Sequence, residues 1–285
     1  MAAPHRSSPP LRTARIPPLL GLLASTACAP ATERPSTAPR GLATTPPATA
    51  SPHSANELVA PVGQRYPMAR VPAGRYRLCC TPGQGAGCEG GVTEHNLPHD
   101  VLIGTFEVTQ GLYAEVAGTG PEHDEECGVD CPVHFVSAAE AEAFADALSV
   151  REGLEPCGRR DVTAAASTCR GYRLPSEEEW EVAARAGADT PYAGGAQAAL
   201  VAWTAENSAH KRHPVGRLQP NALGIYDMSG GVYELIAAQE GREGRALRGG
   251  CWAVPAEGAQ IHARSSISDG YRHHHVGFRL VRTAP

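Results

Sequence analysis

The clearest pattern in the chain is an apolar stripe at helical spacing near its middle. Ser137 and Glu140 stand just before the stripe at the spacing of a capping box, in which each side chain satisfies the backbone N–H of the other residue. Apolar residues then recur at positions i, i+3, i+4 and i+7, which is one face of a helix. They are Ala141, Phe144, Ala145 and Leu148. The pattern predicts a helix that starts after Ser137 and buries one face.

Two further segments carry the same kind of signal. Ser176 and Glu179 form a second capping box, and Gly187 follows as a stop signal. A weaker start lies at Thr109, with Gly118 at the far end. The expected buried stripes are Trp180, Ala183 and Ala184 in the first of these helices and Leu112, Tyr113 and Val116 in the second. The sequence therefore predicts three short, capped helices.

The rest of the folded region consists of short apolar pieces separated by Gly, Pro and Asn, from residue 71 to residue 281. Such pieces are typical of short strands joined by long loops. The composition also favours loops and turns, because the chain has 31 Gly and 25 Pro and an aromatic content of only 5%. We expect an α+β fold that is rich in loops and has few short helices and strands.

The first 63 residues differ in character from the remainder. Basic residues precede an apolar run at 16–23, and small residues then lead to Cys28, which resembles the lipobox of bacterial lipoproteins. The run is too short to span a bilayer. Residues 29–63 are rich in Pro, Ala, Thr and Ser and predict a flexible spacer. We expect a leader at 1–28, a linker at 29–63 and a domain at 64–285; the alternative is a disordered leader with an accidental apolar patch.

Charge argues against one class of partner. The formal net charge is −5, and the first 63 residues hold five Arg and two Glu, which leaves 20 basic and 28 acidic residues for the domain. A domain with a net charge of about −8 lacks the basic surface that nucleic acids require. We expect no nucleic-acid partner.

Cysteine usage fits an exported chain. Apart from the cysteine that ends the leader, eight remain, and an even set at close spacing favours disulfides in an oxidising compartment. The expected pairs are Cys127 with Cys131 and Cys157 with Cys169. A zinc site that uses Cys127, Cys131 and His134 is the competing interpretation, but no second C-x2-C pair follows at the usual distance.

A series of motifs gives the chain a family resemblance. In order they are VPAG at 71–74, FEVTQGLY at 106–113, CPVHFVS at 131–137, YRLPSEEEWE at 172–181, PNALGIYDMSGGVYE at 220–234, LRGGCW at 247–252 and GFR at 277–279. Together they resemble the formylglycine-generating enzyme (FGE), or sulfatase-modifying factor, domain. The resemblance covers nearly all of residues 70–283 and implies a C-type-lectin-like architecture.

The segment 227–234 is the candidate metal site. Two carboxylates, Asp227 and Glu234, flank a pair of glycines, and such a loop can turn side chains and carbonyls toward a hard cation such as calcium. The resemblance implies calcium ligands at Asp227, Gly230, Val232 and Glu234. The alternative is that Asp227 caps a turn and that Glu234 pairs with an arginine such as Arg248.

The resemblance fails at the catalytic centre. FGEs oxidise a substrate cysteine at copper(I) that two cysteines hold, and soft copper(I) requires thiolates. Val254 and Ala259 occupy the two cysteine positions here, so copper is not expected. Cys251 stands at the family's active-site serine position beside Trp252 and is a weak catalytic candidate. We favour a disulfide for Cys251 over a free functional thiol.

Four histidines near the C-terminus could replace the missing thiols as ligands for copper, iron or zinc. They are His262, His273, His274 and His275. Side chains of consecutive residues in an extended segment alternate between faces, so at most two of the last three would converge. A surface loop is the favoured interpretation.

Two functions fit these observations. The first is a non-catalytic binding or scaffold module at the cell envelope or in the extracellular space, whose lectin-like groove takes a peptide, a glycan or another envelope component. A lipid anchor at Cys28 would hold it at the membrane. The second is a metal-dependent enzyme of the sulfatase-modifying factor family that oxidises or otherwise modifies a protein or peptide.

Overall fold

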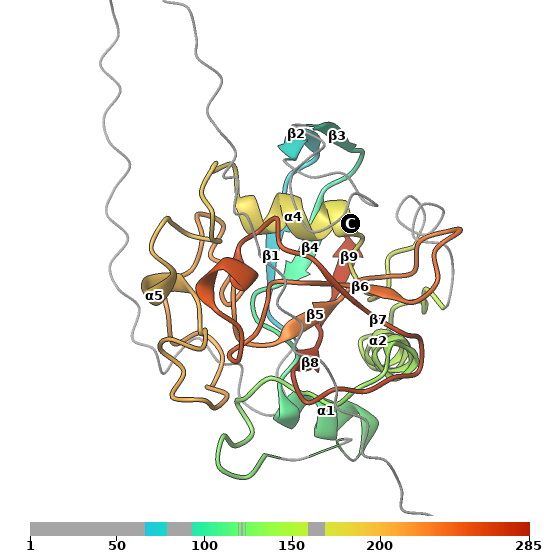
Figure 1. The fold of residues 1–285 in the computed structure, drawn as a ribbon. Coiled ribbons are helices and arrows are strands. Elements are labelled where there is room, and N and C mark those ends of the chain that lie inside the picture. The colour runs from blue at the N-terminus through green and yellow to red at the C-terminus, as the bar shows by residue number, and fades with distance from the viewer. Residues whose placement is uncertain (1–65, 79–92, 119, 121, 123, 159–168) are drawn as a thin grey trace, which may run out of the picture.

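The computed structural model describes residues 66–78, 93–118, 120, 122, 124–158 and 169–285 (Figure 1). The predicted leader and linker, and with them Cys28, lie outside the described residues, as do Cys79, Cys80 and Cys88. Among the described residues, none of the helices has the length and apolar character needed to cross a bilayer.

The three predicted helices are present with the predicted caps. They are α1 (Gln110–Ala117), α2 (Ala138–Arg151) and α4 (Glu177–Arg185), and the structure adds the short helix α5 (Ala198–Val201) and a 3-10 turn at Ala256–Ala259. Thr109 caps α1, and complete capping boxes start α2 at Ser137 and α4 at Ser176. Helix α4 ends in the left-handed residue Ala186, directly before the predicted stop, Gly187.

The described strands are short and form three small sheets. The first joins β1 (Met68–Val71), β4 (Val101–Gly104) and β9 (Val281–Thr283); the second joins β2 (Gly74–Leu78) and β3 (Thr93–Leu97). The third has the order β7 (Ser265–Ile267), β6 (Arg245–Arg248), β5 (Tyr233–Leu235) and β8 (Val276–Gly277). All described pairs are antiparallel except β5 with β8. Strand β9 pairs with β4, so the end of the chain closes the domain near its start.

Two large apolar clusters make up most of the core of the described residues, and two smaller ones accompany them. One gathers around α1 and α2, where Tyr113, Phe144 and Phe278 pack their rings together. The other joins α4 to the sheet of β1, β4 and β9 and includes the fully buried Trp180. Figure 1 shows α4 close to that sheet, with α1 and α2 toward the other end of the domain. The predicted α+β, loop-rich architecture is confirmed.

Buried arginines tie helix α4 to the segments around it. The guanidinium of Arg173 donates to both carboxylate oxygens of Glu179 at 2.6 Å. Arg248, on β6, donates to Glu177 at 2.8 Å and to Glu181 at 2.9 Å, and its guanidinium stacks over Trp180. A buried charge is tolerated only when it is paired and hydrogen-bonded, so these contacts fix the helix in one orientation.

Both predicted disulfides are confirmed. Cys127 is bonded to Cys131 in the loop after α1, and Cys157 is bonded to Cys169 after α2. The zinc alternative that used Cys127 and Cys131 as thiolates is therefore ruled out, because both sulfur atoms are consumed by the bond.

Candidate functional site

The loop at 227–234 brings two buried acids together. Asp227 adopts a left-handed backbone conformation, with φ of 57°, and its carboxylate accepts a hydrogen bond from the backbone N–H of Gly216 at 2.7 Å. Glu107, from the segment between β4 and α1, reaches the same loop and accepts from the N–H of Val232 at 3.4 Å. Its other oxygen, Oε2, is buried without a hydrogen-bond partner in the described part of the chain.

Glu234, at the far end of the loop, is engaged differently. Its carboxylate accepts from Arg279 at 2.8 Å and from the indole N–H of Trp180 at 2.7 Å. Both charged side chains are completely buried. Glu234 does pair with an arginine, but the partner is Arg279 of the GFR motif; Arg248, which the sequence suggested, lies beside Glu177 and Glu181 instead.

The electrostatics of this loop disfavour two negative charges. Burial raises the pKa of Asp227 to about 6, against the pull of the Gly216 hydrogen bond and the Arg279 charge. Burial, followed by the neighbouring Asp227 charge, raises the pKa of Glu107 well above its ordinary value. A cation bound between these carboxylates would favour their charged forms.

The donor set fits a hard cation only in part. Asp227 and the unpartnered Oε2 of Glu107 are oxygen ligands of the kind that calcium prefers, whereas calcium would have to compete with Arg279 and Trp180 for Glu234. The calcium set of Asp227, Gly230, Val232 and Glu234 stays a prediction. Glu107 was missed at the sequence level, although a Glu inside the apolar motif FEV was a visible signal.

Calcium is expected to stabilise the protein at neutral pH. Without metal, the folded state holds a proton on Asp227 that the unfolded chain loses above about pH 4, so the contribution of this residue to stability falls as pH rises from about 4 to about 6. At pH 7.5, which lies above the pKa of about 6, Asp227 is mainly ionised. A bound calcium ion would offset this buried charge, and the melting temperature should rise by about 2–4 °C per kcal/mol of binding. Melting curves in calcium and in a chelator at pH 7.5 measure the effect.

Asp227→Asn is the matched variant, because asparagine tolerates the left-handed conformation and keeps the acceptor for Gly216. We expect it to abolish the calcium response and to remove the part of the pH dependence between 4 and 6 that Asp227 contributes. An equal calcium response in the wild type and the variant would show that calcium does not bind at this loop.

The residues that the family resemblance places at the copper positions, Val254 and Ala259, offer no metal ligand. Val254 follows strand β6 in a turn, and Ala259 ends the 3-10 turn. Cys251 is the one free cysteine among the described residues, and it is fully buried. The predicted disulfide at Cys251 is wrong, because the structure shows Cys251 as a free thiol. Burial raises the pKa of its thiol, so Cys251 has the environment of an inert core cysteine.

Native protein is expected to protect Cys251 from alkylation. A buried thiol with a raised pKa presents almost no thiolate to the reagent. Iodoacetamide should therefore modify the peptide that contains Cys251 only after denaturation, which peptide mass mapping without reductant would show. Rapid labelling of the native protein at this residue would restore Cys251 as a functional thiol.

A half-buried aromatic cluster lies beside the 227–234 loop. We define it as Trp203, His213, Trp252 and His275. Trp203 stacks on His213 with ring centroids 3.8 Å apart, and Trp252 meets His275 edge to face at 4.8 Å. The two tryptophans contact the loop through backbone bonds: the N–H of Gly231 donates to Trp203, and the N–H of Trp252 donates to Gly231. Neither indole N–H has a hydrogen-bond partner in the described structure.

The histidine tract behaves as its alternation predicts. The rings of His273 and His275 lie 4.8 Å apart, and His274 turns away from them toward Glu122. The tract forms a turn before β8 in which His274 is exposed and the other two are half-buried, which confirms the surface-loop interpretation. His262 lies elsewhere, near Arg185 and Arg248.

Three comparisons relate the chain to known proteins. It is 29% identical to the chaperone protein LppX of Paenibacillus barcinonensis over 65% of this chain and 80% of that protein. It is 33% identical to the inactive C-alpha-formylglycine-generating enzyme 2 of Mus musculus over 40% of this chain and 44% of that protein. The solved structure of Treponema denticola variable protein 1 superposes with a TM-score of 0.65 at 29% identity, covering 76% of this chain and 95% of that one.

The family model named sulfatase-modifying factor enzyme 1-like domain matches residues 56–284. The match covers the three capped helices, the 227–234 loop and the final GFR motif that the fold brings together. This chain therefore belongs to the FGE-sulfatase family.

Proposed function

We propose that this chain is an exported, non-catalytic binding module of its family and does not act as a formylglycine-generating oxidase. One observation carries the proposal: Val254 and Ala259 stand at the copper positions, and the single free thiol of the described region, Cys251, is buried. One thiolate cannot form the two-cysteine copper(I) site. Two relatives support a role without catalysis, because one is named an inactive formylglycine-generating enzyme and the other a chaperone.

The aromatic cluster is the binding surface in this proposal. Tryptophan offers a large, rigid contact area that loses little conformational entropy on binding. Both tryptophans are half-buried, and their indole N–H groups are buried without a described partner, so the exposed parts of the rings would make the contact with a ligand. Partly exposed aromatic faces suit a peptide or a glycan of the envelope.

Export and anchoring complete the proposal. The leader would carry the chain across the membrane, Cys28 would take a lipid, and the residues up to 63 would hold the domain away from the bilayer. Mass spectrometry of the mature N-terminus is the test. A lipid-modified Cys28 at the new N-terminus is expected, and an intact Met1 would contradict export by this route.

Metal content and oxygen uptake test the absence of catalysis. The purified full chain is loaded with copper(I), and an active formylglycine-generating enzyme is treated in the same way as the positive control. The chain should retain no stoichiometric copper and should consume no oxygen with a cysteine-containing peptide. Copper or iron near one per chain together with oxygen uptake would instead favour the metal-dependent enzyme.

The binding surface is tested on peptide and glycan arrays. Wild-type protein is expected to bind a subset of probes, and Trp252→Ala should lose them while Tyr271→Ala keeps them. Tyr271 is a matched control because it is a large aromatic that is 59% exposed and outside the aromatic cluster. Equal loss in both variants, or no loss in either, would remove the cluster as the binding surface.

A further inference from the structure

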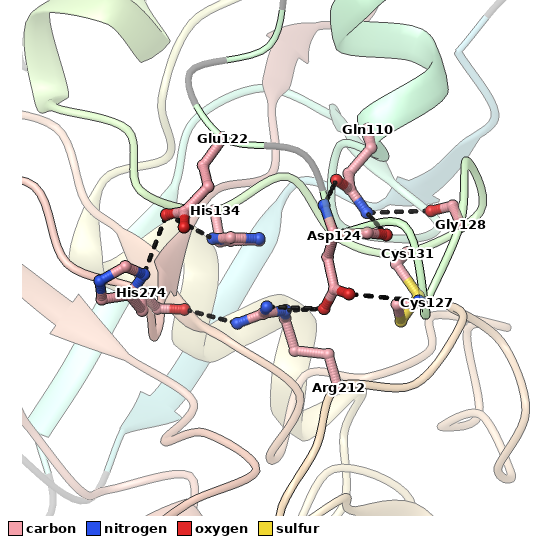
Figure 2. Close-up of polar contacts among 9 residues, drawn as sticks. All are labelled: Gln110, Glu122, Asp124, Cys127, Gly128, Cys131, His134, Arg212 and His274. Atoms are coloured by element: carbon pink, nitrogen blue, oxygen red, sulfur yellow. Dashed lines mark hydrogen bonds and ion pairs between the residues drawn. A yellow bond between two sulfur atoms is a disulfide. The ribbon is translucent and has the colours of Figure 1, made fainter.

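A second group of ligand-type side chains lies outside the aromatic cluster and the 227–234 loop. Glu122, His134 and His274 come from three separate segments and direct one donor atom each toward a common point, with these atoms within 4.8 Å of one another (Figure 2). The Nδ1 atom of His274 lies 2.9 Å from Oε2 of Glu122, and Nδ1 of His134 lies 3.9 Å from the same oxygen.

His134 is the unusual member of this group. Its side chain is only 1% exposed, yet neither ring nitrogen makes a hydrogen bond to any described residue. Buried polar atoms almost always have a partner, and an orphaned pair on one ring indicates a missing water or ion. Burial also lowers the pKa of His134 to about 4, so the ring is neutral and able to ligate at neutral pH.

The chain around His134 is held firmly in place. The Cys127–Cys131 disulfide closes the preceding loop, and the side chain of Gln110 binds that loop through Asp124 and Gly128 (Figure 2). Phe135, the next residue, has φ of 58°, a left-handed conformation that is strained for an aromatic residue. Its ring stacks on His274 at 4.6 Å, which places that imidazole beside His134.

The nearest fixed positive charge is already neutralised. Arg212 donates to one oxygen of Asp124 at 2.6 and 2.9 Å, and to the backbone carbonyl of His274 at 3.2 Å. The arginine therefore orients the histidine segment, while Asp124 offsets the charge that would otherwise repel a cation.

We propose that Glu122, His134 and His274 form a binding site for a divalent transition-metal ion of the zinc class. Two imidazoles and one carboxylate are a ligand set for zinc, and they leave at least one coordination position for water or for a group of a partner molecule. Calcium does not suit the set, because it requires six to eight oxygen ligands.

The distances require only a small adjustment. Ligands at about 2.0–2.1 Å from a tetrahedral ion lie roughly 3.3 Å apart, between the two separations to Glu122 that the structure shows. His274 is 56% exposed and Glu122 is 41% exposed at the side chain, so both can move toward the fixed His134. The ion would satisfy one orphaned nitrogen of His134, and its charge would be partly offset by Glu122.

Zinc binding by the full chain, measured by calorimetry with ZnCl₂ and by metal analysis after dialysis, tests this site. The protein is kept without reductant, so that Cys127 and Cys131 stay bonded and cannot act as thiolates. About one zinc per chain is expected. His274→Ala and Glu122→Gln should each weaken binding by about tenfold or more.

His210→Ala is the matched control, since His210 is an exposed histidine outside the group. His274→Ala and Glu122→Gln change partly exposed side chains, so they test the site without disturbing the buried His134. Any of three results would overturn the proposal. They are an unchanged zinc affinity in His274→Ala and Glu122→Gln, zinc binding only after reduction of the disulfide, and no zinc binding at millimolar concentration. None of these outcomes depends on whether the aromatic cluster binds a ligand.

Discussion

Replacing Arg279 with methionine is expected to lower the free energy of unfolding by about 3–5 kcal/mol. The guanidinium is completely buried, and it donates to Glu234, to the carbonyl of Gly104 and to the carbonyl of Tyr226. Its loss leaves the buried carboxylate of Glu234 with the indole of Trp180 as its one remaining hydrogen-bond donor among the described residues, and an uncompensated buried charge is costly. Urea unfolding at pH 7.5 in a chelator measures the change.

Three companion variants show whether the effect comes from the buried pair. Arg75→Met breaks an exposed ion pair with Glu94 and should cost about 1 kcal/mol or less. Arg279→Lys should not rescue stability, because an ammonium cannot reproduce the fork of donors that reaches three segments. Adding Glu234→Gln to Arg279→Met should recover part of the loss by removing the orphaned charge. A change below 1 kcal/mol in Arg279→Met would contradict this account.

Gly230→Ala is expected to destabilise the protein by about 2–5 kcal/mol through two effects. The φ of Gly230 is 77°, a left-handed conformation that costs a non-glycine residue roughly 1–2 kcal/mol. A Cβ at this position would also lie 2.1 Å from the backbone oxygen of Trp203, and relieving such a clash typically costs a further 1–3 kcal/mol. Thermal and urea unfolding measure the loss.

Gly241→Ala separates the two effects. Gly241 has nearly the same φ, 75°, but a Cβ there would meet no atom within 4 Å, so only the conformational cost applies. We expect this variant to lose about 1–2 kcal/mol. Equal losses in the two variants would show that the close contact between Gly230 and Trp203 contributes nothing. A larger loss in Gly230→Ala should be accompanied by altered fluorescence, since Trp203 would have to move.

The helices were predictable because their signals are local. The Ser137 and Ser176 capping boxes and the apolar stripes behind them are read within one or two turns, and the structure places each helix start where the box predicts it. The two disulfides were predictable for the same reason, because each joins cysteines that are close in sequence.

Contacts between distant segments were not predictable from these patterns. Glu234 could have paired with any nearby arginine, and its choice of Arg279 depends on β5 and β8 lying side by side. Glu107 joins Asp227 across more than a hundred residues, and Glu122 meets His274 across a longer separation still. The apolar neighbours of Glu107 in the motif FEV signal that it is buried, but a single sequence does not show which distant residue a side chain will meet.

The sequence by itself determined the family motifs, the helix starts and the loop-rich α+β character. Through the family resemblance it also gave the prediction that Val254 and Ala259 stand at the copper positions. The tertiary structure alone decided which charges are buried together, that Cys251 is a free core thiol, and that His134 is buried without a partner beside Glu122 and His274. The physical reason is the distance along the chain over which each kind of interaction acts. Capping and side-chain periodicity act over a few residues, whereas burial and pairing depend on the packing of the whole domain.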